Sequence, residues 1–166
     1  MIIETSRLLL REHHVEDAPF IFELNSDFEV VRYTGDQPFK DVAEAKKLIE
    51  ENILVEYLKY GYGRWAMIEK VSGRYIGWCG LKYQRENGFT DLGYRLKQAA
   101  WNKGYATEAA LSCIEFAWKH KIPRLMGRAM KENSASIKVL EKCGFYYDHD
   151  EIMHDQKATV YFLDKP

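Results

Sequence analysis

The stretch YRLKQAAWNKGYATE, at residues 94–108, decides the fold, because in it a strand ends, a short loop follows and a long helix begins. The first turn of a helix presents unpaired backbone N–H groups and the positive end of the dipole, which together attract anions. Gly104 lets the backbone approach a phosphate closely, since it has no Cβ, and Lys103 adds a positive charge. The pattern therefore predicts a diphosphate-binding loop. The spacing matches neither GxxxxGK[ST] nor GxGxxG, and a glycine before a helix is also consistent with a plain tight turn.

The flanking segments alternate between strand and helix patterns. Ahead of the loop, turns at Val71-Ser72-Gly73 and Asn87-Gly88 predict an antiparallel meander of three strands. Asp41 followed by Glu44 is typical of a capping box that starts a helix. The expected strands are 7–12, 64–69, 74–83, 89–96, 124–130, 145–153 and 157–164, and the expected helices are 16–26, 41–58, 106–118 and 134–143. This order predicts an α/β (α+β) fold with a mixed, mainly antiparallel central sheet of about seven strands and helices on both faces.

Length and composition fit one domain over residues 1–166. Lys and Arg number 24 against 25 Asp and Glu, so the formal net charge is −1, and no electrostatic footprint for nucleic acid or an anionic membrane is expected. No segment has the length of a membrane span, and the N-terminus lacks the apolar core of a signal peptide. The three cysteines form no CxxC pair, which is typical of a reduced, cytoplasmic compartment.

Five separated segments resemble the GNAT superfamily of acyl-CoA-dependent N-acetyltransferases. WNKGYA at 101–106 is similar to its diphosphate-binding core, Q/R-x-x-G-x-G/A, and residues 133–145 match N-x-x-S-x-x-V-L-E-K-x-G-F. TSRLLLRE at 5–12, SDFEVVRYTG at 26–35 and DLGYRL at 91–96 resemble the branch that contains the ribosomal-protein alanine N-acetyltransferases. The chain departs from the branch pattern at Asn102, where the branch usually has glycine. It departs from the superfamily pattern at Trp101, where the superfamily has Gln or Arg but the branch commonly has Trp. Asparagine tolerates left-handed backbone better than most residues, so the loop can keep its shape.

The resemblance implies the acyl-CoA N-acyltransferase fold and the transfer of an acetyl group from acetyl-CoA to a primary amine, either a protein N-terminal α-amine or a small-molecule amine. It implies no metal, and members of this branch often form dimers, so a homodimer is expected. The pantetheine arm would lie beside Tyr94, Arg95 and Leu96 and bond to Asn133, and the diphosphate would be held by Asn102, Lys103, Gly104, Tyr105, Ala106 and Thr107.

Two residues are candidates for the proton transfers: Ser136, as the resemblance implies, and Asp91, from its place on the fourth strand near where the acceptor should enter. Many members carry a tyrosine acid seven residues after the asparagine, but this chain has Leu140 there, so Ser136 is expected to contact or protonate the thiolate. The alternative is that Ser136 only supports the first turn of its helix. Asp91 is the expected base, with Glu86 as a second carboxylate near the acceptor entrance, although Asp91 could equally be a plain strand-start carboxylate.

Other polar residues have simpler expected roles. Glu108 would repel a diphosphate, so it is expected to stabilise the helix N-terminus. His149 and His154 should point to opposite faces of a strand, which argues against a metal site. His13 is expected at the surface and Cys113 in the core.

Two other functional classes stay open at this level. One is a non-catalytic CoA-binding or regulatory domain of the same fold, and the other is an interaction module, which leaves the loop unexplained. The near-neutral charge argues only weakly against a strongly cationic acceptor.

Overall fold

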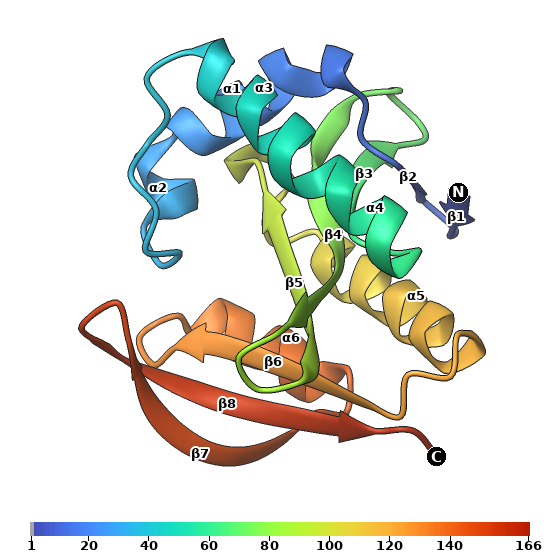
Figure 1. Cartoon of the computed structure of the whole chain (residues 1–166), viewed down its shortest axis with the longest axis vertical. Helices are drawn as coiled ribbons and strands as arrows, with labels where there is room; N and C mark the ends of the chain where they lie inside the picture. The colour runs from blue at the N-terminus through green and yellow to red at the C-terminus, as the bar shows by residue number, and fades with distance from the viewer. Residues whose placement is uncertain (1) are drawn as a thin grey trace.

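The computed structural model describes residues 2–166 and forms one eight-stranded sheet with helices on both faces (Figure 1). The sheet order is β1-β2-β3-β4-β5-β6-β8-β7, and every neighbouring pair is antiparallel except β5 and β6. The strands are β1 (Ile2–Glu4), β2 (Leu8–Arg11), β3 (Arg64–Glu69), β4 (Tyr75–Gln84), β5 (Phe89–Leu96), β6 (Arg124–Met130), β7 (Tyr146–Met153) and β8 (Gln156–Asp164). The predicted mixed, mainly antiparallel sheet is confirmed. The additional strand is β1, whose three residues are too few to show a strand period.

The helices form two layers around this sheet. α1 (Ala18–Ser26), α2 (Phe28–Val31), α3 (Val42–Leu48) and α4 (Leu54–Tyr60) belong to one side, and α5 (Tyr105–Lys119) and α6 (Ser134–Lys142) to the other. Asp41 caps α3 as predicted, since its Oδ1 accepts from the N–H of Glu44 at 3.0 Å. The expected helix 41–58 is interrupted by a π-helical turn at Ile49–Ile53, which turns both isoleucines into the core. Among residues 2–166 no helix is long and apolar enough to cross a membrane.

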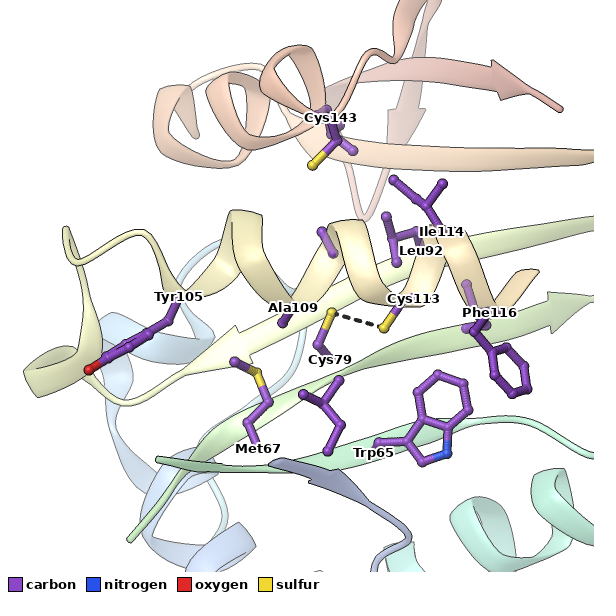
Figure 2. Close-up of a cluster of buried hydrophobic side chains, with 14 of the residues drawn as sticks. Trp65, Met67, Cys79, Leu92, Tyr105, Ala109, Cys113, Ile114, Phe116 and Cys143 are labelled. Carbon is purple, nitrogen blue, oxygen red and sulfur yellow. Dashed lines mark hydrogen bonds between the residues drawn. The ribbon is translucent and has the colours of Figure 1, made fainter. Parts of the chain in front are cut away.

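The main core lies between the sheet and α5 (Figure 2). Trp65 packs edge-on against Phe116, with ring centroids 4.9 Å apart. Cys113 is buried as predicted, with its Sγ 3.6 Å from that of Cys79, and all three cysteines are free thiols.

The surface prediction for His13 is wrong. The side chain is only 1% exposed, because the segment that follows β2 packs against α4, where the N–H of His13 donates to the hydroxyl of Tyr57. Its ring bonds to the Tyr75 hydroxyl at 3.1 Å and to the carbonyl of Arg64 at 2.9 Å. Burial lowers the pKa of His13 from 6.5 to about 4, so the ring is neutral at physiological pH.

The strands β5 and β6 separate soon after they meet. Their parallel pairing comprises only Thr90↔Leu125 and Asp91↔Met126, although both strands continue further. Figure 1 shows the two strands running in diverging directions from this point. The edge of β5 from Gly93 to Leu96 therefore borders a wedge, in which its peptide groups have no β6 partner.

Candidate active site

The loop that joins β5 to α5 has the conformation of an anion cradle. Asn102 and Gly104 both adopt left-handed backbone, with φ of 58° and 79°. Gly104 is the N-cap residue of α5 and has no side chain with which to cap the helix. The N–H groups of the first turn are thus open to an external acceptor, which is the arrangement that binds phosphate at helix N-termini. Asn102 takes the left-handed conformation that glycine would otherwise supply.

Trp101 anchors this loop to the strand before it. Its indole Nε1 donates to the carbonyl oxygen of Leu96 at 2.9 Å, so the departure from Gln or Arg at this position has a structural role. Leu96 itself is buried in the main core.

Across the wedge, β5 and α6 meet through a small hydroxyl network. The Tyr94 hydroxyl lies 3.1 Å from Ser136 Oγ, and Asn133 Nδ2 donates to the same oxygen at 3.1 Å. Asn133 also caps α6, since its Oδ1 accepts from the N–H of Ser136 at 3.2 Å. Because Asn133 donates to Ser136 Oγ, the serine proton is free to point to another acceptor. Burial raises the pKa of Tyr94, so its hydroxyl stays protonated.

Leu140 occupies the position of the missing tyrosine and belongs to the core. A Cβ added at Gly127 of β6 would come within 2.4 Å of Leu140 Cδ2, so α6 packs against β6 at this point. Tyr94 is predicted to lie beside the pantetheine arm, but the sequence pattern gives no role for its hydroxyl. Its contact with Ser136 depends on the packing of α6 and has no signal in the sequence.

Asp91 lies where β5 and β6 part, on the opposite face of β5 from Tyr94. The side chain is half-buried, and its Oδ1 is inaccessible and has no hydrogen-bond partner. Burial raises the pKa of Asp91 from 3.8 to about 7, and nearby Arg128 and Lys82 only partly oppose this. A carboxyl with such a pKa exchanges its proton near neutrality, as a general base must. Glu86, the other carboxylate considered, is exposed in the turn between β4 and β5 and does not join Asp91.

Comparison with known proteins identifies the family of this chain. The model of the acetyltransferase (GNAT) domain family matches residues 7–146. The chain belongs to the GNAT family. It is an acetyl-CoA-dependent N-acetyltransferase, and the predicted family is confirmed.

Relatives of this GNAT domain resemble it in sequence or in fold. It is 34% identical over 143 residues to the uncharacterized N-acetyltransferase p20 of Bacillus licheniformis, covering 85% of this chain and 80% of that protein. A structure of RimL, the ribosomal L7/L12 α-N-protein acetyltransferase in complex with coenzyme A, superimposes with a TM-score of 0.84 at 17% identity, covering 99% and 98% of the two chains. The spermidine N-acetyltransferase of Vibrio cholerae, solved with CoA and spermine, gives 0.81 at 16% identity and 96% coverage of each chain. The two structural likenesses concern the fold.

The side chain of Arg95 in this GNAT domain lies away from the hydroxyl network. Its guanidinium donates to Asn25 Oδ1 at 2.7 Å and to Asp36 Oδ2 at 2.9 Å, so it anchors α1 and the loop after α2 to β5. Only its backbone borders the wedge. Trp78 lies on the same face, with the guanidinium of Arg95 5.7 Å from its ring centroid.

The remaining candidates are dispersed in the GNAT domain. His149 bonds to its neighbour Asp148, and His154 lies in the turn between β7 and β8, against Gly35. Within residues 2–166 no group of three or more His, Cys, Asp or Glu side chains is placed to hold a metal ion. Glu108 faces the β1–β2 connection, and its carboxylate accepts from Thr5 and Arg7.

Proposed function

We propose that acetyl-CoA binds with its pantetheine arm in the wedge between β5 and β6 and its diphosphate on the loop before α5. The loss of β5–β6 pairing beyond Asp91 is the observation that carries this proposal, because it leaves a strand edge on which an extended amide-containing chain can pair. The residues fit the cofactor. A 3-10 turn at Gln98–Ala100 joins the free edge of β5 to the left-handed loop, and the first turn of α5 follows that loop. Asn133 lies on the α6 side of the same wedge.

Bound in this way, acetyl-CoA supplies a thioester, and the chain supplies the groups that move protons around it. The backbone N–H groups of β5 donate to the thioester oxygen. The amine nitrogen bonds to the acetyl carbon as the carbon–sulfur bond breaks. Asp91 takes the proton of the attacking amine, directly or through water, and the Ser136 hydroxyl donates a hydrogen bond to the departing thiolate, which then takes its proton from water. Asp91 and Ser136 lie on opposite sides of β5, since Ser136 contacts Tyr94 on the other face of the strand. The base therefore approaches the amine from one side, and the hydroxyl approaches the sulfur from the other.

Calorimetric titration with acetyl-CoA tests the cofactor site. We expect the wild-type protein to bind with a Kd on the order of tens of micromolar or tighter. Gly104→Leu should abolish binding, because a side chain is strained at φ 79° and its Cβ would lie 3.4 Å from Arg7 Nη2, so the loop would have to change its shape. Gly61→Leu is the matched control, since Gly61 has φ 72° and open space around it at the end of α4. Absence of binding by the wild type, or equal binding by Gly104→Leu, contradicts the proposed site.

We propose a primary amine as the acceptor. RimL acts on a protein α-amine, and the spermidine enzyme was solved with a polyamine, so the same fold serves both classes of amine. A thiol-release assay with acetyl-CoA over a panel of N-terminal peptides, amino acids, polyamines and aminoglycosides identifies the class. The replacement of the usual tyrosine by buried Leu140 favours a second candidate, a CoA-binding domain without catalysis. Binding of acetyl-CoA without thiol release for any amine on the panel would support that candidate.

A further inference from the structure

The connection between β1 and β2 contacts the loop before α5 and the first turn of α5 through Thr5 and Arg7. Arg7 Nη1 donates to the carbonyl oxygen of Lys103 at 2.8 Å, and Arg7 Nε donates to Glu108 Oε2 at 2.7 Å. The backbone N–H of Arg7 and the hydroxyl of Thr5 both donate to Glu108 Oε1, at 2.8 and 2.6 Å. The guanidinium also lies 4.5 Å from the ring centroid of Tyr105. One arginine thus contacts both the last part of the loop and the first turn of the helix.

Glu108 presents an electrostatic difficulty for a diphosphate site. It is the fourth residue of α5, so its negative charge lies one turn from the N–H groups that would bind the phosphates. Burial opposes ionisation, but the bonds from Thr5 and Arg7 prevail and hold the pKa of Glu108 below its usual range. The carboxylate is therefore charged at neutral pH and would repel a diphosphate. Among residues 2–166, Arg7 is the cation that forms an ion pair with it.

We infer that Arg7 is a positioning residue for the cofactor, because it fixes the Lys103 carbonyl outward and neutralises Glu108. With the carbonyl turned to Arg7, the N–H groups of the loop are left to face the phosphates. When Arg7 neutralises Glu108, the carboxylate no longer offsets the attraction between the positive end of the helix dipole and the diphosphate. This inference rests on the proposed diphosphate site.

The test measures acetyl-CoA affinity in Arg7→Gln, in Glu108→Gln and in the double variant. We expect Arg7→Gln to raise Kd about tenfold, because an unpaired carboxylate then faces the diphosphate. Glu108→Gln should change Kd by no more than about twofold, since the remaining charge is favourable, and the double variant should return to within about threefold of wild type. Arg124→Gln is the matched control. Arg124 is also a half-exposed arginine paired with a carboxylate, Asp164, and it lies beyond the other end of α5, about 20 Å from the loop.

Two further measurements separate this role from a merely structural one. Each single variant breaks the same ion pair, so their thermal unfolding temperatures should fall alike while their affinities differ. The defect of Arg7→Gln should also shrink at about 0.5 M salt, because screening weakens the repulsion from Glu108. Equal affinity losses in both single variants, or a double variant as weak as Arg7→Gln, would overturn the inference. Failure of the wild type to bind acetyl-CoA would instead refute the diphosphate site itself.

Discussion

Replacing Asp91 with asparagine should stabilise the cofactor-free protein at alkaline pH while slowing acetyl transfer. In the folded state Asp91 keeps its proton up to a pKa of about 7, whereas in the unfolded chain it loses the proton near 3.8. A raised folded-state pKa contributes stability that is present below 3.8 and is lost as the pH rises to about 7. Asparagine has nearly the same shape and stays neutral throughout, so the variant does not suffer this loss.

The size of the gain follows from the pKa difference. About 3 pKa units at 1.36 kcal/mol each give an upper limit of about 4 kcal/mol in the free energy of unfolding at pH 7 and above. At pH 5 little more than one of these pKa units has been traversed, so the gain should be at most about 2 kcal/mol. The side chain keeps some contact with solvent, which reduces both values but leaves their order unchanged.

Urea unfolding of both proteins at pH 5 and pH 8, without cofactor, provides the measurement. His13 titrates in both proteins, so its contribution cancels in the difference. Asp150→Asn is the control, because Asp150 is exposed and paired with Lys131, which lowers its pKa, so this variant should gain no stability between the two pH values. An Asp91→Asn protein that is less stable than wild type at pH 8, or whose advantage does not grow with pH, would refute the argument from burial.

Three further outcomes are expected. Burial lowers the folded-state pKa of His13 to about 4, so its contribution to stability is present above pH 6.5 and is lost as the pH falls to 4, by up to about 3 kcal/mol. Urea unfolding in the Asp91→Asn background should show this loss, and adding His13→Asn should remove it. Ser136→Ala should lower the turnover number about tenfold or more and change the acetyl-CoA Kd by less than about twofold, and an unchanged rate would exclude Ser136 from the reaction. Gly127→Val should lower the free energy of unfolding by about 1–3 kcal/mol through overpacking against Leu140, and Leu140→Ala in the same protein should relieve part of that loss, as thermal unfolding would show.

The sequence alone determined the features that depend on neighbouring residues. The period of apolar residues placed the long helix at 106–118, within one residue of α5 at each end. Asn133 was recognisable ahead of its helix, where it forms the N-cap. The glycine and asparagine of the loop before α5 adopt the left-handed backbone that their chemistry favours. Because local preferences of this kind act within a few residues, they can be predicted from the sequence alone.

Only the tertiary structure decided which distant groups meet. β5 and β6 separate after only two paired positions. The tertiary packing places the hydroxyl of Tyr94 beside that of Ser136, although the two residues are 42 positions apart in the sequence. Arg7 contacts Glu108 although the two residues are 101 positions apart in the sequence, and no periodic pattern in the sequence predicts that contact. The wrong prediction for His13 and the pKa of Asp91 have the same origin, because burial depends on what the rest of the chain packs over a residue. The sequence therefore determined the family and the local backbone of the loop before α5, whereas the fold decided which charges and hydrogen bonds surround that loop and the proposed catalytic groups.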